Sequence, residues 1–171
     1  GPPLATAVGD LRSAVVKESC VCIEELATAY GPEFSRATSE VLIPSLLRAS
    51  AVSVTFLSAA ALNAIQKTVQ EGVLGVTKRS VILMANSVMN TISDLKHPMS
   101  RQAAASCLGL LLNDDNMRNL PPAALEAIED AIRSGCADSS LSVRTESRAN
   151  WRKLELVDPV RAATLLVKLP E

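Results

Sequence analysis

Few residues of this chain are of the types that carry out covalent chemistry. Its four cysteines (Cys20, Cys22, Cys107 and Cys136) stand beside a single histidine, His97. No two cysteines have Cys-x-x-Cys spacing, and Cys20 and Cys22 point about 160° apart on a helix. The pattern is typical of free, buried thiols in a reducing compartment, and His97, next to Pro98, is expected in an exposed loop.

Motifs for phosphate or metal chemistry are incomplete in this sequence. Residues 72–75 (GVLG) lack the Lys-Ser/Thr pair of a P-loop, and Asp114, Asp115 and Asp138 lack the alternating oxygen ligands of a calcium loop. Acidic residues that come close together on the expected helices are typical of solvated faces: Glu24, Glu25, Glu126, Glu129 and Asp130. The sequence therefore predicts a protein that is not an enzyme and that uses no metal and no cofactor.

Cations recur in a pattern that could bind an acidic partner. Polar joints lie at residues 10–13, 50–53, 94–98 and 138–142, about 40 to 44 residues apart, which is the period of HEAT-type helical pairs. Three of these joints have an Asp followed six or seven residues later by a base: Asp10 and Lys17, Asp94 and Arg101, Asp138 and Arg144. Such pairs can form a ladder between stacked repeats, so each base is either structural or free to bind a partner.

Helices must position these joints. Turn signals, and prolines in first helical turns, divide the chain into helical segments at residues 13–30, 34–49, 52–70, 77–94, 98–112, 121–136, 140–156 and 159–168. Residues 13–30 and 98–112 are apolar over so much of their circumference that they are expected to pack between neighbours. The pattern predicts an all-α fold, an α-solenoid of about three and a half HEAT-type pairs plus a closing helix. Residues 1–12 are interpreted as too short to supply the first helix of the pair that 13–30 completes.

Composition limits the remaining possibilities. The 171 residues suit one domain, expected over residues 3–171, with Gly1-Pro2 resembling a protease-cleavage scar. A formal net charge of -1 and an aromatic content of 2% argue against nucleic acid or an anionic membrane as partner. No apolar run approaches the roughly 20 residues of a membrane span, and the N-terminus lacks the pattern of a signal peptide.

Three stretches resemble a known family. They are residues 10–20 (DLRSAVVKESC), residues 40–47 (EVLIPSLL, with a proline inside a helix), and residues 142–166, which contain SVR at 142–144, Arg148, Trp151 and DPVRAA at 158–163. These stretches resemble parts of the TOG domains of the CLASP family of microtubule regulators. The first resembles a loop and the second helix of a repeat, and the second resembles the first helix of a repeat. The third resembles the last repeat with its closing helix. With the spacing between them, the resemblance covers nearly the whole chain at low identity.

The resemblance implies a TOG-like paddle that binds tubulin through the loops joining the helices of each pair. Since the tubulin surface is acidic, bases gathered along one edge would suit it. By position, the implied tubulin-binding residues are Arg12, Ser13, Lys17, Lys96, His97, Arg101, Arg144 and Arg148. The implied setting is the cytoplasm and its microtubule cytoskeleton, including the spindle, with other cytoskeletal or kinetochore proteins as further candidate partners.

The chain also departs from the family pattern. TOG domains of this family begin with another repeat, whose loop bears an aromatic anchor for tubulin, and no such repeat is recognised here. Trp151 has the helical spacing of a core residue with Val143, Ser147 and Leu154, and the joint at 49–53 (ASAVS) has no charge. Two alternatives stay open: a TOG-like scaffold that has lost tubulin binding and recruits a kinetochore, centrosomal or ciliary protein, and a plain HEAT scaffold that binds through its concave helical face.

Overall fold

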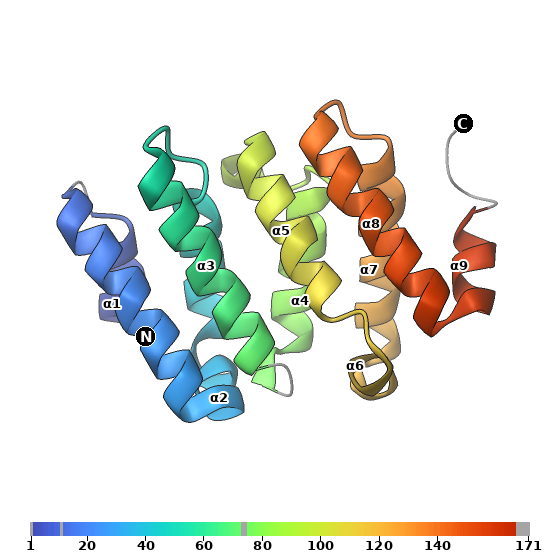
Figure 1. The fold of residues 1–171 in the computed structure, drawn as a ribbon, viewed down its shortest axis with the longest axis horizontal. Coiled ribbons are helices and arrows are strands. Elements are labelled where there is room, and N and C mark those ends of the chain that lie inside the picture. Colours follow the sequence, from blue (N-terminus) through green and yellow to red (C-terminus); the bar gives the residue numbers. More distant parts are fainter. Residues whose placement is uncertain (1, 11, 73–74, 167–171) are drawn as a thin grey trace. The chain divides into compact units, whose positions relative to one another are not determined.

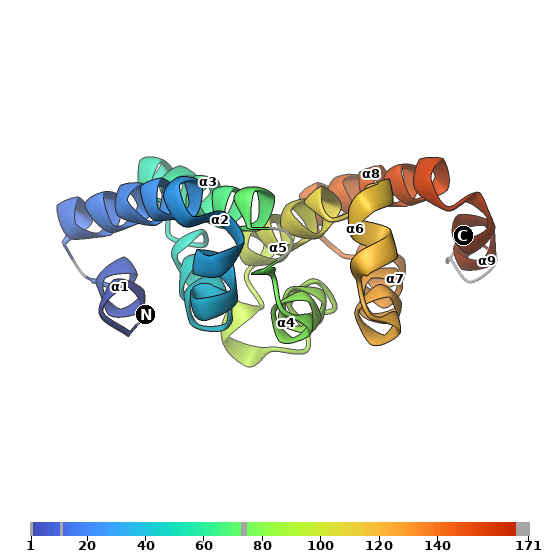
Figure 2. The same cartoon turned by 90° about the horizontal axis from the view of Figure 1, so that it is seen from below.

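The computed structural model of this chain describes residues 2–10, 12–72 and 75–166, and the regular structure within these ranges is helical, without strands. The chain divides into two compact units, unit 1 (Gly1–Ser80) and unit 2 (Val81–Glu171). In each unit, helices pair antiparallel and the pairs stack side by side, which confirms the predicted all-α fold of solenoid-type helical pairs (Figures 1 and 2). Among the described helices, none has the length and apolarity that crossing a bilayer requires.

Unit 1 is built from α1 (Pro2–Val8), α2 (Ser13–Ala49) and α3 (Thr55–Glu71), followed by the start of α4 (Lys78–Val88). Helix α2 joins the two predicted helices 13–30 and 34–49 across a kink at Gly31, where φ is 49°. Glycine adopts this left-handed backbone without steric cost, and Pro32 suits the first turn of the second half. In Figure 2 the first half of α2 lies in one layer with α3, and the second half lies in the other layer with α1.

The interpretation that residues 1–12 are too short to supply the first helix of the pair that 13–30 completes is wrong. Pro2–Val8 form α1, which packs on α2 and buries Val8 completely. Prolines at the start of a helix cost little, because the first amide groups have no partner within the helix. A helix of this length is marginal in isolation, so its contact with α2 is what stabilises it.

Gly75 allows the backbone after α3 to pass directly over the kink of α2. A Cβ at this position would lie 1.9 Å from the carbonyl oxygen of Pro32 and 2.9 Å from the amide nitrogen of Arg36. Both obstacles are backbone atoms, which cannot rotate away.

We expect Gly75→Ala to lower the free energy of unfolding by about 3 kcal/mol, near the upper end of the usual cost of overpacking. Gly9→Ala is the matched control, because its Cβ would meet the carbonyl oxygen of Thr6 at an ordinary 3.6 Å. Urea unfolding of the two variants measures the difference, and equal midpoints would contradict the expected clash.

Unit 2 continues with the rest of α4, the short 3₁₀ turn η2 (Ser93–Leu95), α5 (Pro98–Leu110), α6 (Asp114–Asn119), α7 (Pro122–Cys136), α8 (Leu141–Val157) and α9 (Pro159–Leu166). Helix α8 packs against α5, α7 and α9. Large side chains that are fully buried in this unit include Met84, Leu108, Ile128 and Ile132.

Two segments of unit 2 differ from the predicted helices. The predicted helix 77–94 ends at Val88, because Asn90 takes a left-handed φ of 59° and the amide of Thr91 donates back to the carbonyl oxygen of Asn86. The interval between the predicted helices 98–112 and 121–136 contains the short helix α6, which begins where the side chain of Asn113 accepts from the amide of Asn116.

The cysteines are free as predicted, and Cys20 and Cys107 are buried, whereas Cys22 and Cys136 are only half-buried, which differs from the expected burial of all four thiols. Burial raises the pKa of Cys20 to about 11, with a further contribution from Glu24, and burial also raises the pKa of Cys107. Both thiols therefore stay protonated and unreactive near neutral pH. Trp151 is half-buried, and its indole N–H donates to the carbonyl oxygen of Ala162 at 3.2 Å, which joins α8 to α9.

Candidate functional site

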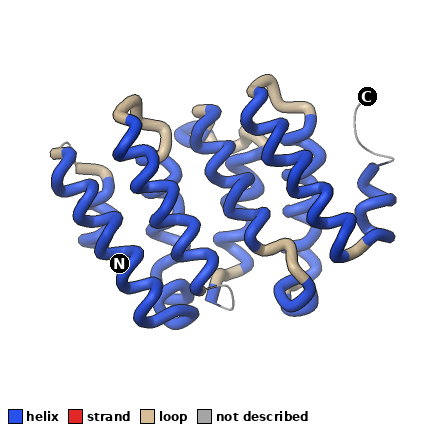
Figure 3. The backbone as a smooth tube through the Cα atoms, viewed as in Figure 1, coloured by secondary structure: helices blue, strands red, loops and turns tan. Residues whose placement is uncertain are grey.

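The joints of unit 1 lie together at one end of its helices (Figure 3). In the first joint, Asp10 accepts three hydrogen bonds from Arg12: from its amide at 2.7 Å, from Nε at 3.0 Å and from Nη2 at 3.1 Å. These bonds lower the pKa of Asp10 to about 2 and raise the pKa of Arg12. Asp10 thus pairs with Arg12 and not with Lys17, the base that the sequence pattern places with it.

Three predicted site residues stand at the start of α2. The Arg12 side chain is 77% exposed at the N-cap position, and Ser13 and Lys17 follow on α2, both exposed and one turn apart. Lys17 makes no ion pair with any residue that the structure describes. Its ammonium group is available to an acidic partner.

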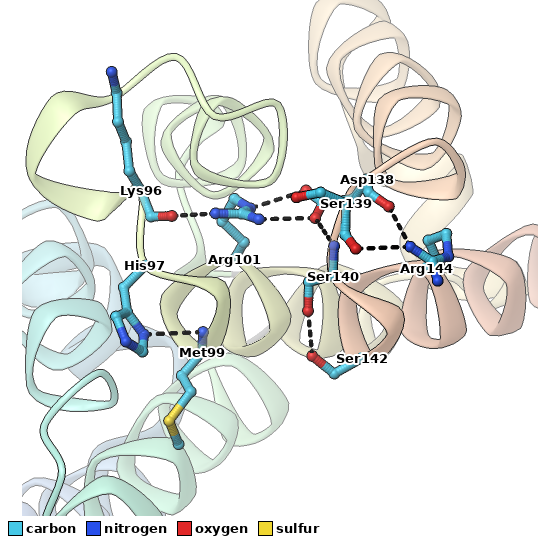
Figure 4. A network of polar contacts seen from close by, with 9 residues as sticks. All are labelled: Lys96, His97, Met99, Arg101, Asp138, Ser139, Ser140, Ser142 and Arg144. Atoms are coloured by element: carbon cyan, nitrogen blue, oxygen red, sulfur yellow. Dashed lines mark hydrogen bonds and ion pairs between the residues drawn. The ribbon is translucent and has the colours of Figure 1, made fainter.

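In unit 2, Lys96 and His97 stand before α5. His97 is its N-cap residue, and the ring Nδ1 accepts from the amide of Met99 at 3.3 Å. Both residues are exposed, which agrees with the predicted loop position of His97. The carbonyl oxygen of Lys96 accepts from Nη1 of Arg101, so the Lys96 side chain projects from a joint whose backbone is fixed (Figure 4).

The structure does not present Arg101 at the surface, where a tubulin contact would need it. Its side chain is 6% exposed and holds the carboxylate of Asp138, itself 8% exposed, through Nη2 at 2.7 Å and Nε at 2.9 Å (Figure 4). Arg101 and Asp138 belong to successive helical pairs of unit 2, so the ladder interpretation holds for this base. Arg101 fixes both joints of the unit relative to each other.

Arg144 and Arg148 begin α8 after the second joint of unit 2. Arg144 is half-buried, and its Nη1 donates to the carbonyl oxygens of Asp138 at 2.7 Å and Ser139 at 2.9 Å. Arg144 therefore closes its own joint. Arg148, one turn further on, is exposed and has no ion-pair partner in the described ranges.

Asp138 organises this joint as an anion. Burial of the carboxyl group raises its pKa, but hydrogen bonds from Arg101 and from the Ser140 amide, at 2.7 Å, outweigh burial and hold the pKa of Asp138 below its ordinary value. Asp10 and Asp138 each accept from the amide two residues on, which is the N-cap residue of the next helix. The same turn thus starts α2 in unit 1 and α8 in unit 2.

We expect the stability advantage of the native chain over Asp138→Asn to be present at pH 7 and to disappear in acid. An unfolded Asp titrates near about 3.9. The pKa of Asp138 in the folded protein is lower than this unfolded value. The carboxylate therefore stabilises the fold at pH values above the unfolded pKa, and this stabilisation is lost as the pH falls through the folded pKa. Urea unfolding of both proteins at pH 7, 5 and 3 measures this difference, and an advantage that grows toward acid pH would contradict the assignment.

The joint between α2 and α3 exposes apolar side chains, which the charge pattern of the sequence does not predict. Val52, Val54 and Phe56 are 38%, 42% and 54% exposed, although large apolar side chains usually avoid a solvated turn. The signal that could have found them is the sequence VSVTF at 52–56, an apolar run at a joint. We call these three residues the apolar joint.

Four exposed bases at the joints can bind an acidic surface, and we call them the joint cations: Arg12 and Lys17 in unit 1, Lys96 and Arg148 in unit 2. Within the described ranges, His, Cys, Asp and Glu side chains do not gather in groups of three that could hold a metal. The joint cations can supply electrostatic contact with another macromolecule, and the apolar joint can supply apolar contact.

Comparisons with known proteins agree with the resemblance noted in the sequence. The sequence is 28% identical to Protein stu-1 of Neurospora crassa over 166 residues, and 29% identical to Protein STU1 of Chaetomium globosum over 163 residues. These alignments cover 95% and 94% of this chain, which spans 14% of the length of each relative. The profile of the family described as CLASP N terminal matches residues 2–171. The chain belongs to the CLASP N-terminal family.

Proposed function

We propose that this chain is a non-catalytic tubulin-binding module of a CLASP-like microtubule regulator. Residues 3–171 act as one TOG-like domain that holds tubulin through the joints between paired helices, without making or breaking a covalent bond. The protein works in the cytoplasm on the microtubule cytoskeleton, including the spindle.

The observation that carries the proposal is the exposure of the joint cations. Each unit presents two of them at its joints, and Lys17, Lys96 and Arg148 make no ion pair with other described residues. The whole chain has a formal net charge of -1, so attraction to an acidic partner depends on individual exposed cations such as Lys17, Lys96 and Arg148 and not on the total charge.

The predicted site residues divide into contacts and positioning residues. The joint cations, Ser13 and His97 are the contacts, because all of them are exposed. Arg101 and Arg144 are positioning residues, because their guanidinium groups are bonded to Asp138 and to the backbone of the joints.

Binding to unpolymerised tubulin tests the proposal. The purified chain is mixed with tubulin dimers and analysed by size-exclusion chromatography at 50 and 200 mM salt. We expect co-elution at low salt that weakens at high salt, because exposed charges are screened within about 8–10 Å at physiological ionic strength. Absence of co-elution at low salt would contradict the proposal.

A second candidate function has an observation in its favour. The apolar joint exposes three large side chains where TOG-like binding through charge needs none. A TOG-like scaffold that recruits a kinetochore, centrosomal or ciliary protein would use such a surface. Two results together would favour this candidate. The native chain would bind a kinetochore, centrosomal or ciliary protein but not tubulin, and the Phe56→Ser variant would no longer bind that protein.

A further inference from the structure

Large apolar side chains stand exposed on the first turns of α5 and α8. Met99, the second residue of α5, is 41% exposed, and Leu141, the first residue of α8, is 66% exposed. Single exposed apolar side chains are common on protein surfaces, whereas apolar side chains that gather at one place mark sites of protein contact. The position of these two residues therefore decides what they can do.

Both first turns belong to one edge of unit 2. Helices α5 and α8 pack against each other and begin at the same end (Figure 1). Arg101, two residues after Met99, holds the carboxylate of Asp138, three residues before Leu141, through hydrogen bonds of 2.9 and 2.7 Å (Figure 4). Because this ion pair is buried, it fixes the two turns relative to each other. A partner that binds both turns therefore loses little conformational entropy in ordering them.

The side of α8 that begins with Leu141 continues with polar and cationic residues. At about 100° per residue, Thr145, Arg148 and Arg152 lie within about 40° of Leu141 around the helix axis, and all four residues are exposed. The buried residues of α8 lie on the opposite side: Val143, Ser147, Asn150 and Leu154. We call the four exposed residues the outer face of α8.

The charge of this outer face is positive. Arg148 and Arg152 make no ion pair with any residue that the structure describes. Of the two acidic residues in α8, Glu146 lies about 140° from Leu141 around the helix, and Glu155 lies in the last turn, at the opposite end of the helix. The two guanidinium groups are therefore available to carboxylates of an acidic partner, whose geometry arginine matches with paired hydrogen bonds.

This combination of groups is typical of a protein interface. Interface cores are enriched in methionine and arginine and depleted of lysine and acidic residues. Covering Met99 and Leu141 with a partner adds a hydrophobic contribution to the binding free energy that charge alone does not supply. This edge of unit 2 therefore suits an acidic protein surface that also offers apolar area.

We propose that Met99 and Leu141 are the apolar anchors with which unit 2 binds an acidic protein surface, and that Arg148 and Arg152 bind carboxylates of that surface along the outer face of α8. The proposal rests on the proposed function, because the acidic protein expected at the joints is the tubulin dimer. It adds two apolar contacts and the cation Arg152 to the contacts named for that function.

Two double variants test the apolar anchors by biolayer interferometry. Met99→Ser with Leu141→Ser removes both anchors, whereas Leu156→Ser with Val160→Ser changes apolar residues that are 84% and 79% exposed where α8 ends and α9 begins. We expect the anchor variant to bind the tubulin dimer at least tenfold more weakly, at 50 and at 200 mM salt alike, because salt does not screen apolar contact. The control variant should stay within twofold of the native chain. Met99→Ala with Leu141→Ala is the second anchor variant if the serine variant does not fold.

A charge reversal tests the outer face of α8. Arg152→Glu places a carboxylate on this face, and Arg118→Glu, at an exposed position of α6, is the matched control. We expect Arg152→Glu to lower the affinity for the tubulin dimer at least fivefold at 50 mM salt and by less at 200 mM salt. Arg118→Glu should stay within twofold of the native chain. Both variants should keep the native unfolding midpoint, because the side chains that they change are exposed.

The outcomes separate failure of these contacts from failure of the proposed function. A native chain that does not bind tubulin overturns both proposals. Tubulin binding that is as tight in the anchor variant as in the native chain, or equal losses in the anchor variant and its control, overturns the anchors and leaves the tubulin-binding function in place. Equal affinities of Arg152→Glu and Arg118→Glu overturn the contact along the outer face of α8.

Discussion

Replacing Arg101 by alanine should lower the free energy of unfolding by about 3–5 kcal/mol, the usual cost of removing one partner of a buried ion pair. The substitution leaves the carboxylate of Asp138 buried, and it also removes the hydrogen bond to the carbonyl oxygen of Lys96. Urea unfolding followed by circular dichroism measures the change. Arg152→Ala, at an exposed position of α8, is the matched control and should stay within about 0.5 kcal/mol of the native chain.

The double variant Arg101→Met with Asp138→Leu separates the contribution of the ion pair to the free energy of unfolding from the contribution of side-chain packing. Removing both charges eliminates the unpaired buried carboxylate, so the double variant should be more stable than Arg101→Ala. If Arg101→Ala matches the exposed control, Arg101 is not a positioning residue and its burial has no consequence for the joints.

Reversing three joint cations should abolish most tubulin binding. Lys17→Glu, Lys96→Glu and Arg148→Glu together put carboxylates where an acidic surface is expected to dock, so like-charge repulsion replaces attraction. We expect the affinity for the tubulin dimer to fall at least tenfold at 50 mM salt, as measured by biolayer interferometry. The unfolding midpoint should change little, because these three side chains are exposed and unpaired among the described residues.

A matched triple variant controls for net charge. Arg36→Glu, Lys78→Glu and Arg118→Glu reverse three exposed cations that lie outside the joints. This variant should keep at least half of the native affinity. Equal losses in the two triple variants would show that binding follows total charge and not the position of the joints.

The helical pairs could be predicted from the sequence because local signals set them. Proline in first turns and polar joints mark the starts of α5, α7, α8 and α9. The sequence does not predict helix α1, because its seven residues carry too little periodicity and the helix is stabilised by packing on α2. The sequence predicts a break between helices 13–30 and 34–49, whereas the structure has a kink at Gly31 within α2. The difference between a break and a kink depends on the backbone angles of this one residue.

The candidate site could be predicted only in part, since exposure depends on tertiary contacts. Lys17, Lys96 and Arg148 are exposed as a partner contact requires, but the sequence does not show that Arg101 meets Asp138, which is 37 residues away. The Asp-to-base spacing indicated that a ladder could form without saying which bases would enter it. A charge pattern does not predict the apolar joint, because the sequence VSVTF at 52–56 presents exposed hydrocarbon and no charge.

The most direct test of the central claim is a hydrogen-exchange footprint of the chain, free and saturated with tubulin dimer. First-turn amides of a helix lack partners within the helix and exchange fast, so a bound partner protects them visibly. We predict that tubulin slows exchange at the first turns of α2, α5 and α8, within residues 13–14, 99–100 and 141–143. Protection confined to the other ends of the helical pairs, at residues 29–34 and 113–121, with the first turns unchanged, would contradict tubulin binding through the joints.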